Sequence, residues 1–157
     1  MKTFFSLVCV VFLLAGSVFS QDFEALSKYE FTNVESYKTE RSKVLECANY
    51  LFNTPSNTAE LNRLTALQYI MKWMEGTPAF TFEIGEEAMK LSKGNTDLLG
   101  LYFAGMTKVV LDNEGDTLNA QQIYKRTEAL LVDYCANSAN KMKPSKTLKK
   151  LIKLQKR

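Results

Sequence analysis

The sequence predicts an all-α fold, with antiparallel helix pairs stacked as a short helical-repeat array of about five to six helices. Apolar residues recur at helical spacing beyond residue 21, and no segment keeps the alternation of a half-buried strand. A run of similar residues also repeats at an offset of 38 positions. A period of this size, with two helices in each unit, is typical of helical-repeat proteins.

Capping residues, prolines and glycines set the expected ends of the helices. Helices are expected over residues 34–52, 58–75, 83–93, 97–112 and 120–140, and from 146 to the end. Their expected N-terminal caps are Thr32, Asn57, Asn95 or Thr96, Asn119 and Ser145. Pro55 and Pro144 stop the helices that precede them, because proline has no amide hydrogen and clashes with the preceding turn.

The repeated run pairs residues 57–61 (NTAEL) with residues 95–99 (NTDLL). Pro55-Ser-Asn57 resembles the junction between units of the tetratricopeptide repeat family, and residues 88–91 (AMKL) before Gly94-Asn95 resemble the end of a unit's second helix. The small residues Gly100, Ala104 and Gly105 fall where close helix contact needs them.

The resemblance to tetratricopeptide repeats covers roughly residues 42–112. It departs from the family at Gly94, which stands in place of the junction proline, and the Trp-x-x-Leu-Gly-x-x-Tyr signature is missing. The resemblance implies paired antiparallel helices and a concave face that binds an extended partner.

Residues 1–20 have the layout of a secretory signal peptide. Lys2 precedes an apolar run from Phe4 to Ala15, and small residues lead up to Ser20. The run is short for a membrane span, which leaves an uncleaved anchor as the less favoured alternative. We expect cleavage after Ser20, a mature start at Gln21, and a secreted or periplasmic location.

Charge divides the remaining chain into an acidic helical domain, 21–140, and a basic tail, 141–157. The domain carries 11 Lys and Arg against 17 Asp and Glu, whereas the tail carries 8 Lys and Arg and no acidic residue. Such a balance does not favour nucleic acid as the partner of an exported domain.

The basic tail has the pattern of an amphipathic helix. Its apolar side consists of Leu148, Leu151, Ile152 and Leu154, and its polar side of Lys146, Lys149, Lys150, Lys153 and Lys156. Such a helix either covers the open end of a repeat array or lies on an anionic membrane surface. A membrane surface is therefore an alternative partner.

The sequence lacks the residues that several kinds of catalysis need. The sequence contains no histidine, which removes the usual general base and most zinc sites, and it has no glycine-rich phosphate loop. Glu83, Glu86 and Glu87 stand at an expected helix start, where the helix dipole favours acidic residues. Residues 112–116 do not follow the calcium-loop rule, since the glycine precedes Asp116. We therefore expect that the protein binds no cofactor, has no metal site and is not an enzyme.

Tyr69 and Trp73 lie four residues apart on one expected helix, so their rings share a face. One interpretation makes them a core plug between helices, because buried aromatics dominate cores. The other makes them the edge of a groove for a partner. Should a groove exist, these two residues are the candidates for partner binding.

Cys47 and Cys135 remain after the predicted cleavage. A disulfide requires Cα atoms within about 7 Å, whereas the first and fifth helices of a stacked array lie about 20 Å apart. We favour two buried thiols, and a disulfide would instead indicate a closed bundle.

These observations favour an exported, non-catalytic helical-repeat domain that binds a protein partner. The alternative is an envelope-surface protein that attaches to anionic lipid or polymer through its basic C-terminal helix. Both remain hypotheses at the level of the sequence.

The signal peptide is testable by mass. The exported protein should have an intact mass that corresponds to a start at Gln21, because signal peptidase cleaves after a small residue such as Ser20. A membrane-bound form that retains Met1 would contradict the secreted interpretation.

Overall fold

The computed structural model describes residues 23–156; the predicted signal peptide and Gln21 lie outside this range. The described residues form α-helices and one short 3-10 helix, and no strand occurs among them. The α-helices are α1 (Phe23–Lys28), α2 (Val34–Thr39), α3 (Arg41–Asn53), α4 (Glu60–Gly76), α5 (Glu86–Ser92), α6 (Thr96–Asp112), α7 (Ala120–Ala136) and α8 (Lys146–Gln155). The all-α prediction is confirmed.

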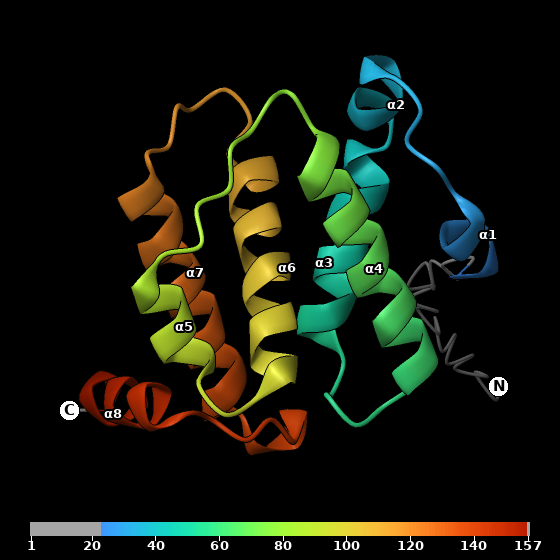
Figure 1. Ribbon diagram of the computed structural model, residues 1–157. Coiled ribbons are helices and arrows are strands. Elements are labelled where there is room, and N and C mark those ends of the chain that lie inside the picture. The colour runs from blue at the N-terminus through green and yellow to red at the C-terminus, as the bar shows by residue number, and fades with distance from the viewer. Residues whose placement is uncertain (1–22, 157) are drawn as a thin grey trace, which may run out of the picture.

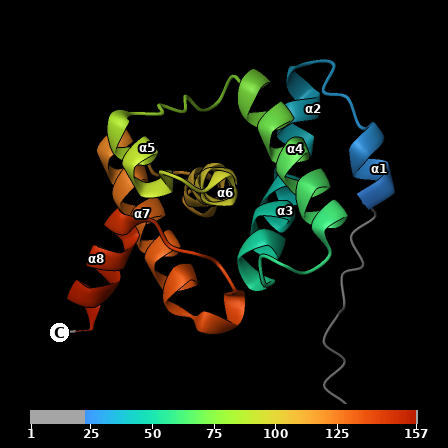
Figure 2. The same ribbon diagram turned by 60° about the horizontal axis from the view of Figure 1, so that its bottom comes forward.

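Helix α6 occupies the centre of the molecule. Helices α3 to α7 run alternately up and down, and α6 is seen end-on between the others when the molecule is turned (Figures 1 and 2). It packs against α3, α4, α5 and α7, while α8 crosses the lower end and contacts α5 and α7. The predicted stack of repeat units is not confirmed by this arrangement.

The sequence of α6 explains its central position. Apolar residues surround the helix on all sides, and 11 of its residues are buried. Gly100 and Gly105 allow its neighbours to approach closely: a Cβ at Gly100 would lie 2.6 Å from Leu67 Cδ2, and one at Gly105 would lie 2.9 Å from Thr127 Cγ2. The predicted role of these small residues in close helix contact is confirmed.

Three predicted caps are present. Asn95 accepts hydrogen bonds from the first amides of α6, Asn119 and Gln122 form a capping box on α7, and Ser145 Oγ accepts from Leu148 N on α8. Each of these caps is a residue with a side-chain oxygen that stands just before an apolar run, and this pattern is a clear local signal of a helix start.

Other helix ends differ from the prediction. The helix expected over 34–52 is divided at Glu40 into α2 and α3, and its capping box joins Asn33 and Ser36 instead of Thr32 and Glu35. Helix α4 begins after Ala59, whose φ of 46° is left-handed, so Asn57 does not cap it. Helix α5 starts three residues late at Glu86, and α7 ends at Ala136, before the 3-10 helix Ser138–Asn140.

Helix α1 was not predicted, because six residues are too few to show a helical period. It packs against α4, and the side chain of Leu26 is buried. The ring of Phe23 lies 5.0 Å from that of Tyr50 on α3. Tertiary contact, more than local propensity, therefore holds this segment in place.

Cys47 and Cys135 are both buried, and within residues 23–156 no disulfide joins them. Their helices, α3 and α7, pack on different sides of α6 (Figure 2). Burial raises the pKa of the Cys135 thiol from 9.0 to about 11, because the thiolate would lose its solvation.

The thiols are testable by alkylation without reductant. We expect slow labelling of the folded protein near neutral pH and labelling of both cysteines after denaturation, because only the solvated thiolate reacts quickly. The neutral Cys135 thiol favours the folded state below pH 9, and this contribution is lost as the pH rises towards 11. Labelling that appears only after reduction would contradict the thiol assignment.

Candidate functional site

Trp73 is fully buried, with 0% of the residue exposed. Its indole Nε1–H donates a hydrogen bond to the carbonyl oxygen of Tyr37 at 2.8 Å. The centroids of the Phe80 and Phe82 rings lie 5.8 and 6.1 Å from that of the indole. Trp73 therefore joins α4 to α2 on one side and to the segment between α4 and α5 on the other.

Tyr69 is 1% exposed and lies in the same core. Its hydroxyl donates to Glu40 Oε2 at 2.6 Å, and the rings of Tyr29 and Phe31 pack around it. Burial, followed by the hydrogen bond to Glu40, raises the pKa of the phenol well above its usual range. Both predicted partner-binding side chains are thus enclosed by the protein, and the contacts are those that the core-plug interpretation describes.

The apolar side of α8 is already used inside the molecule. Leu148 is completely buried, and Leu151 and Ile152 are half-buried against the core. Gln155 Nε2 also donates to Asp133 on α7 at 2.7 Å. Only Leu154, at 61% exposed, points away from the protein. The helix is therefore docked onto α5 and α7 as a cover.

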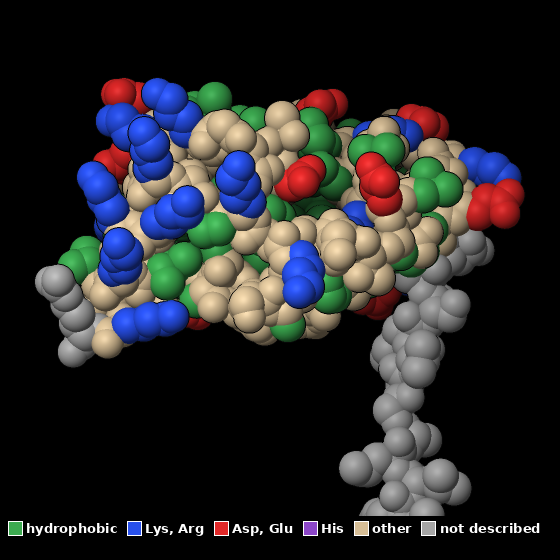
Figure 3. All heavy atoms as spheres, turned by 90° about the horizontal axis from the view of Figure 1, so that it is seen from below, with side chains coloured by type: hydrophobic (Ala, Val, Ile, Leu, Met, Phe, Trp, Pro, Cys, Tyr) green, Lys and Arg blue, Asp and Glu red, His purple; other side chains and the backbone are tan. Residues whose placement is uncertain are grey.

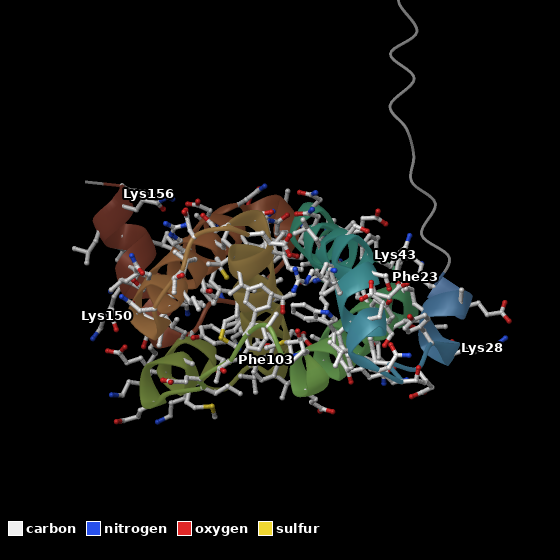
Figure 4. All side chains as sticks on the ribbon, turned by 90° about the horizontal axis from the view of Figure 1, so that it is seen from above. Phe23, Lys28, Lys43, Phe103, Lys150 and Lys156 are labelled. Atoms are coloured by element: carbon white, nitrogen blue, oxygen red, sulfur yellow. The ribbon has the colours of Figure 1, made fainter. Side chains whose placement is uncertain are left out.

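The lysines of α8 form an exposed basic surface, which we call the lysine face. It consists of Lys146, Lys149, Lys150, Lys153 and Lys156. Basic side chains gather over this end of the molecule in Figure 3, and in Figure 4 Lys150 and Lys156 lie at the end opposite Lys28 of α1. None of the ion pairs formed within residues 23–156 involves these lysines.

The acidic residues at the start of α5 do not form a metal-binding cluster. Glu86 pairs with Lys90 at 2.9 Å, and this hydrogen bond lowers the pKa of its exposed carboxyl. Among residues 23–156, no group of three or more potential metal ligands lies close together. Glu86 and Glu87 stand in the first turn of α5, where the helix dipole favours acidic residues, whereas Glu83 lies before the helix.

A cavity of about 380 Å³ lies between residues 79–83, the upper half of α6 and the start of α7. Its lining includes Phe82, Tyr102, Met106, Ile123 and Tyr124. The sequence does not indicate this cavity, because its walls come from three separate segments and none of them carries a motif. Phe80 and Phe82, two aromatic residues in a short loop, are the signal in the sequence that lies nearest to it.

Comparison with known proteins yields no relative. No protein-family model matches the sequence, and neither a curated protein nor a solved structure is detectably similar. None of the helices within residues 23–156 has the length and hydropathy that crossing a bilayer needs.

Replacing Trp73 tests its role in the core. We expect Trp73→Ala to lower the free energy of unfolding by about 3–5 kcal/mol, because it removes a buried ring and the bond to Tyr37. Met71→Ala on the exposed side of α4 should change it by less than about 1 kcal/mol. Chemical denaturation measures both, and a stable Trp73→Ala variant that loses a partner would establish the groove instead.

Proposed function

We propose that this protein is an exported, non-catalytic binding protein that attaches to an anionic, phosphate-bearing lipid or polymer of the cell envelope. The observation that carries this proposal is the lysine face of α8, whose five ammonium groups are exposed and have no carboxylate partner among residues 23–156. The missing histidine and the signal-peptide pattern support the non-catalytic and exported parts of the proposal.

The docking of α8 limits how this attachment works. A helix that lies in a membrane interface buries its apolar side among the acyl chains. In α8 that side is occupied, since Leu148, Leu151 and Ile152 pack inside the protein. Only the ammonium groups and Leu154 remain outside. The attachment is therefore Coulombic, and the body stays folded beside the surface.

Coulombic attachment has a characteristic strength and salt dependence. Each basic residue near an anionic surface contributes roughly 1 kcal/mol, and this attraction falls off within the Debye length of about 8–10 Å at physiological salt. The lysines face one side of a ten-residue helix, so several of them reach a flat surface together. Binding should therefore be strong at low salt and weak at high salt.

A protein partner remains the second candidate, because one surface of α4 favours it. Leu61, Leu64 and Met71 are 73%, 49% and 37% exposed. At 100° per residue they fall within an arc of about 80°, which makes an apolar stripe outside the core. In this second candidate, the stripe takes the place of Tyr69 and Trp73 as the surface that binds a protein partner. The stacked-repeat organisation also stays a prediction, with the α3–α4 and α5–α6 pairs as its units.

The proposal is tested by vesicle co-sedimentation. The protein should bind phosphatidylcholine vesicles that contain phosphatidylglycerol at about 50 mM salt and dissociate at about 300 mM. Lys149→Gln, Lys150→Gln and Lys153→Gln together should weaken binding on the order of tenfold to a hundredfold. Long-chain polyphosphate as a competitor distinguishes a polymer target from a lipid one, according to which probe the protein prefers.

A second triple variant controls for net charge. Lys28→Gln, Lys38→Gln and Lys125→Gln change the charge equally but lie on other helices. They should leave binding nearly unchanged. Equal weakening by both sets would show that the whole protein, not α8, provides the attraction. If neither probe binds at low salt, the proposal fails.

A further inference from the structure

The cavity beside residues 79–83 has the dimensions and walls of a small-molecule site. Its volume of about 380 Å³ lies in the range of ligand pockets. One wall is formed by Tyr102, Met106 and Val110 of α6, and another by Ile123 and Tyr124 of α7. These side chains would enclose an apolar body of modest size.

The charge at the cavity is acidic. Glu83 and Asp116 line it, and none of the lysines or arginines within residues 23–156 does. Neither carboxylate takes part in the ion pairs formed within residues 23–156. Two carboxylates in the lining of a cavity attract a cation and disfavour an anion.

The aromatic lining suits a cation as well. Phe82 and Tyr102 line the cavity, and the faces of such rings attract ammonium groups. Tyr124 also lines it, but Lys125 Nζ already lies 5.4 Å from the centroid of that ring. The Tyr124 hydroxyl donates to Glu128 Oε2 at 2.8 Å, so its oxygen is still able to accept a hydrogen bond.

The segment that forms the third wall offers main-chain acceptors. In the part of the chain that the structure describes, residues 79–83 make no backbone–backbone hydrogen bond. The segment is held instead by side chains, since Phe80 and Phe82 pack on Trp73 and the Arg41 guanidinium lies 5.5 Å from the Phe80 ring centroid. Its carbonyl oxygens therefore remain available to an ammonium group.

From these walls, charges and rings we propose that the cavity binds a small organic cation, an amine with an apolar or aromatic body. The apolar body lies against Met106 and Ile123, and the ammonium group lies at the edge, between Glu83, Asp116 and the aromatic rings. This site is distinct from the lysine face, because α7 starts at the cavity and ends beside α8 (Figure 1).

Three matched probes test the proposal on the unmodified protein. These are 4-phenylbutylammonium, 4-phenylbutan-1-ol and 4-phenylbutanoate, which differ in the charge of the head group. Titration calorimetry gives each Kd, and Trp73 emission locates binding because its ring packs on Phe80 and Phe82 of the cavity wall. We expect the cation to bind, the alcohol to bind about tenfold more weakly, and the carboxylate to bind weakest.

Variants then assign the preference to named residues. Glu83→Gln with Asp116→Asn should remove most of the preference for the cation over the alcohol and leave the alcohol's Kd unchanged. Glu60→Gln with Asp97→Asn is the matched control, since these acids do not line the cavity. Ala120→Phe, at an exposed lining position, should weaken the cation and the alcohol alike by filling the space.

The results of these experiments test the cation site independently of the proposed surface attachment. Equal affinity for all three probes, no binding of the cation, or a preference that survives the loss of both carboxylates would overturn the proposal. The α8 lysine variants should leave cation binding intact, so the two sites succeed or fail independently.

Discussion

The close packing of α6 against its neighbours is the constraint on which the rest of the structure depends. Gly100 and Gly105 leave no room for a Cβ beside Leu67 of α4 and Thr127 of α7. Thr127 is fully buried at this contact, and its hydroxyl has no hydrogen-bond partner in the described structure. Because α6 takes up one face of each surrounding helix, those helices turn their remaining faces outward. The cavity and the docking place of α8 both follow from that arrangement.

The parts of the structure that the sequence could predict are those decided by one segment alone. The caps at Asn95, Asn119 and Ser145 and the lysine face of α8 each depend on local spacing along a single helix. The division of the first predicted helix at Glu40 could not be predicted, since that residue has no breaking tendency of its own. Tyr69 and Trp73 share a face as expected. Their burial depends on Glu40 and Tyr37, whose positions are set by tertiary packing.

The charge asymmetry of the sequence becomes a spatial separation in the fold. Helix α7 has 17 residues and is about 25 Å long, with the acidic cavity at its start and the basic helix α8 beside its end. This distance exceeds the Debye length at physiological salt, so the carboxylates do not neutralise the lysines. If the lysine face lies on an anionic surface, the start of α7 points away from that surface and the cavity stays open to solution.

Trp73, the single tryptophan, has a part both in the core and in the wall of the cavity. Trp73 is a core side chain, yet the rings that it supports belong to a cavity wall. The segment 79–83 makes no backbone–backbone hydrogen bond with the rest of residues 23–156, so its position depends on the contacts of Phe80 and Phe82 with the indole. The same indole donates to Tyr37 and so connects this wall to α2. The shape of the cavity therefore depends on how Trp73 packs in the core. A change in the contacts of the indole alters the packing and the cavity together.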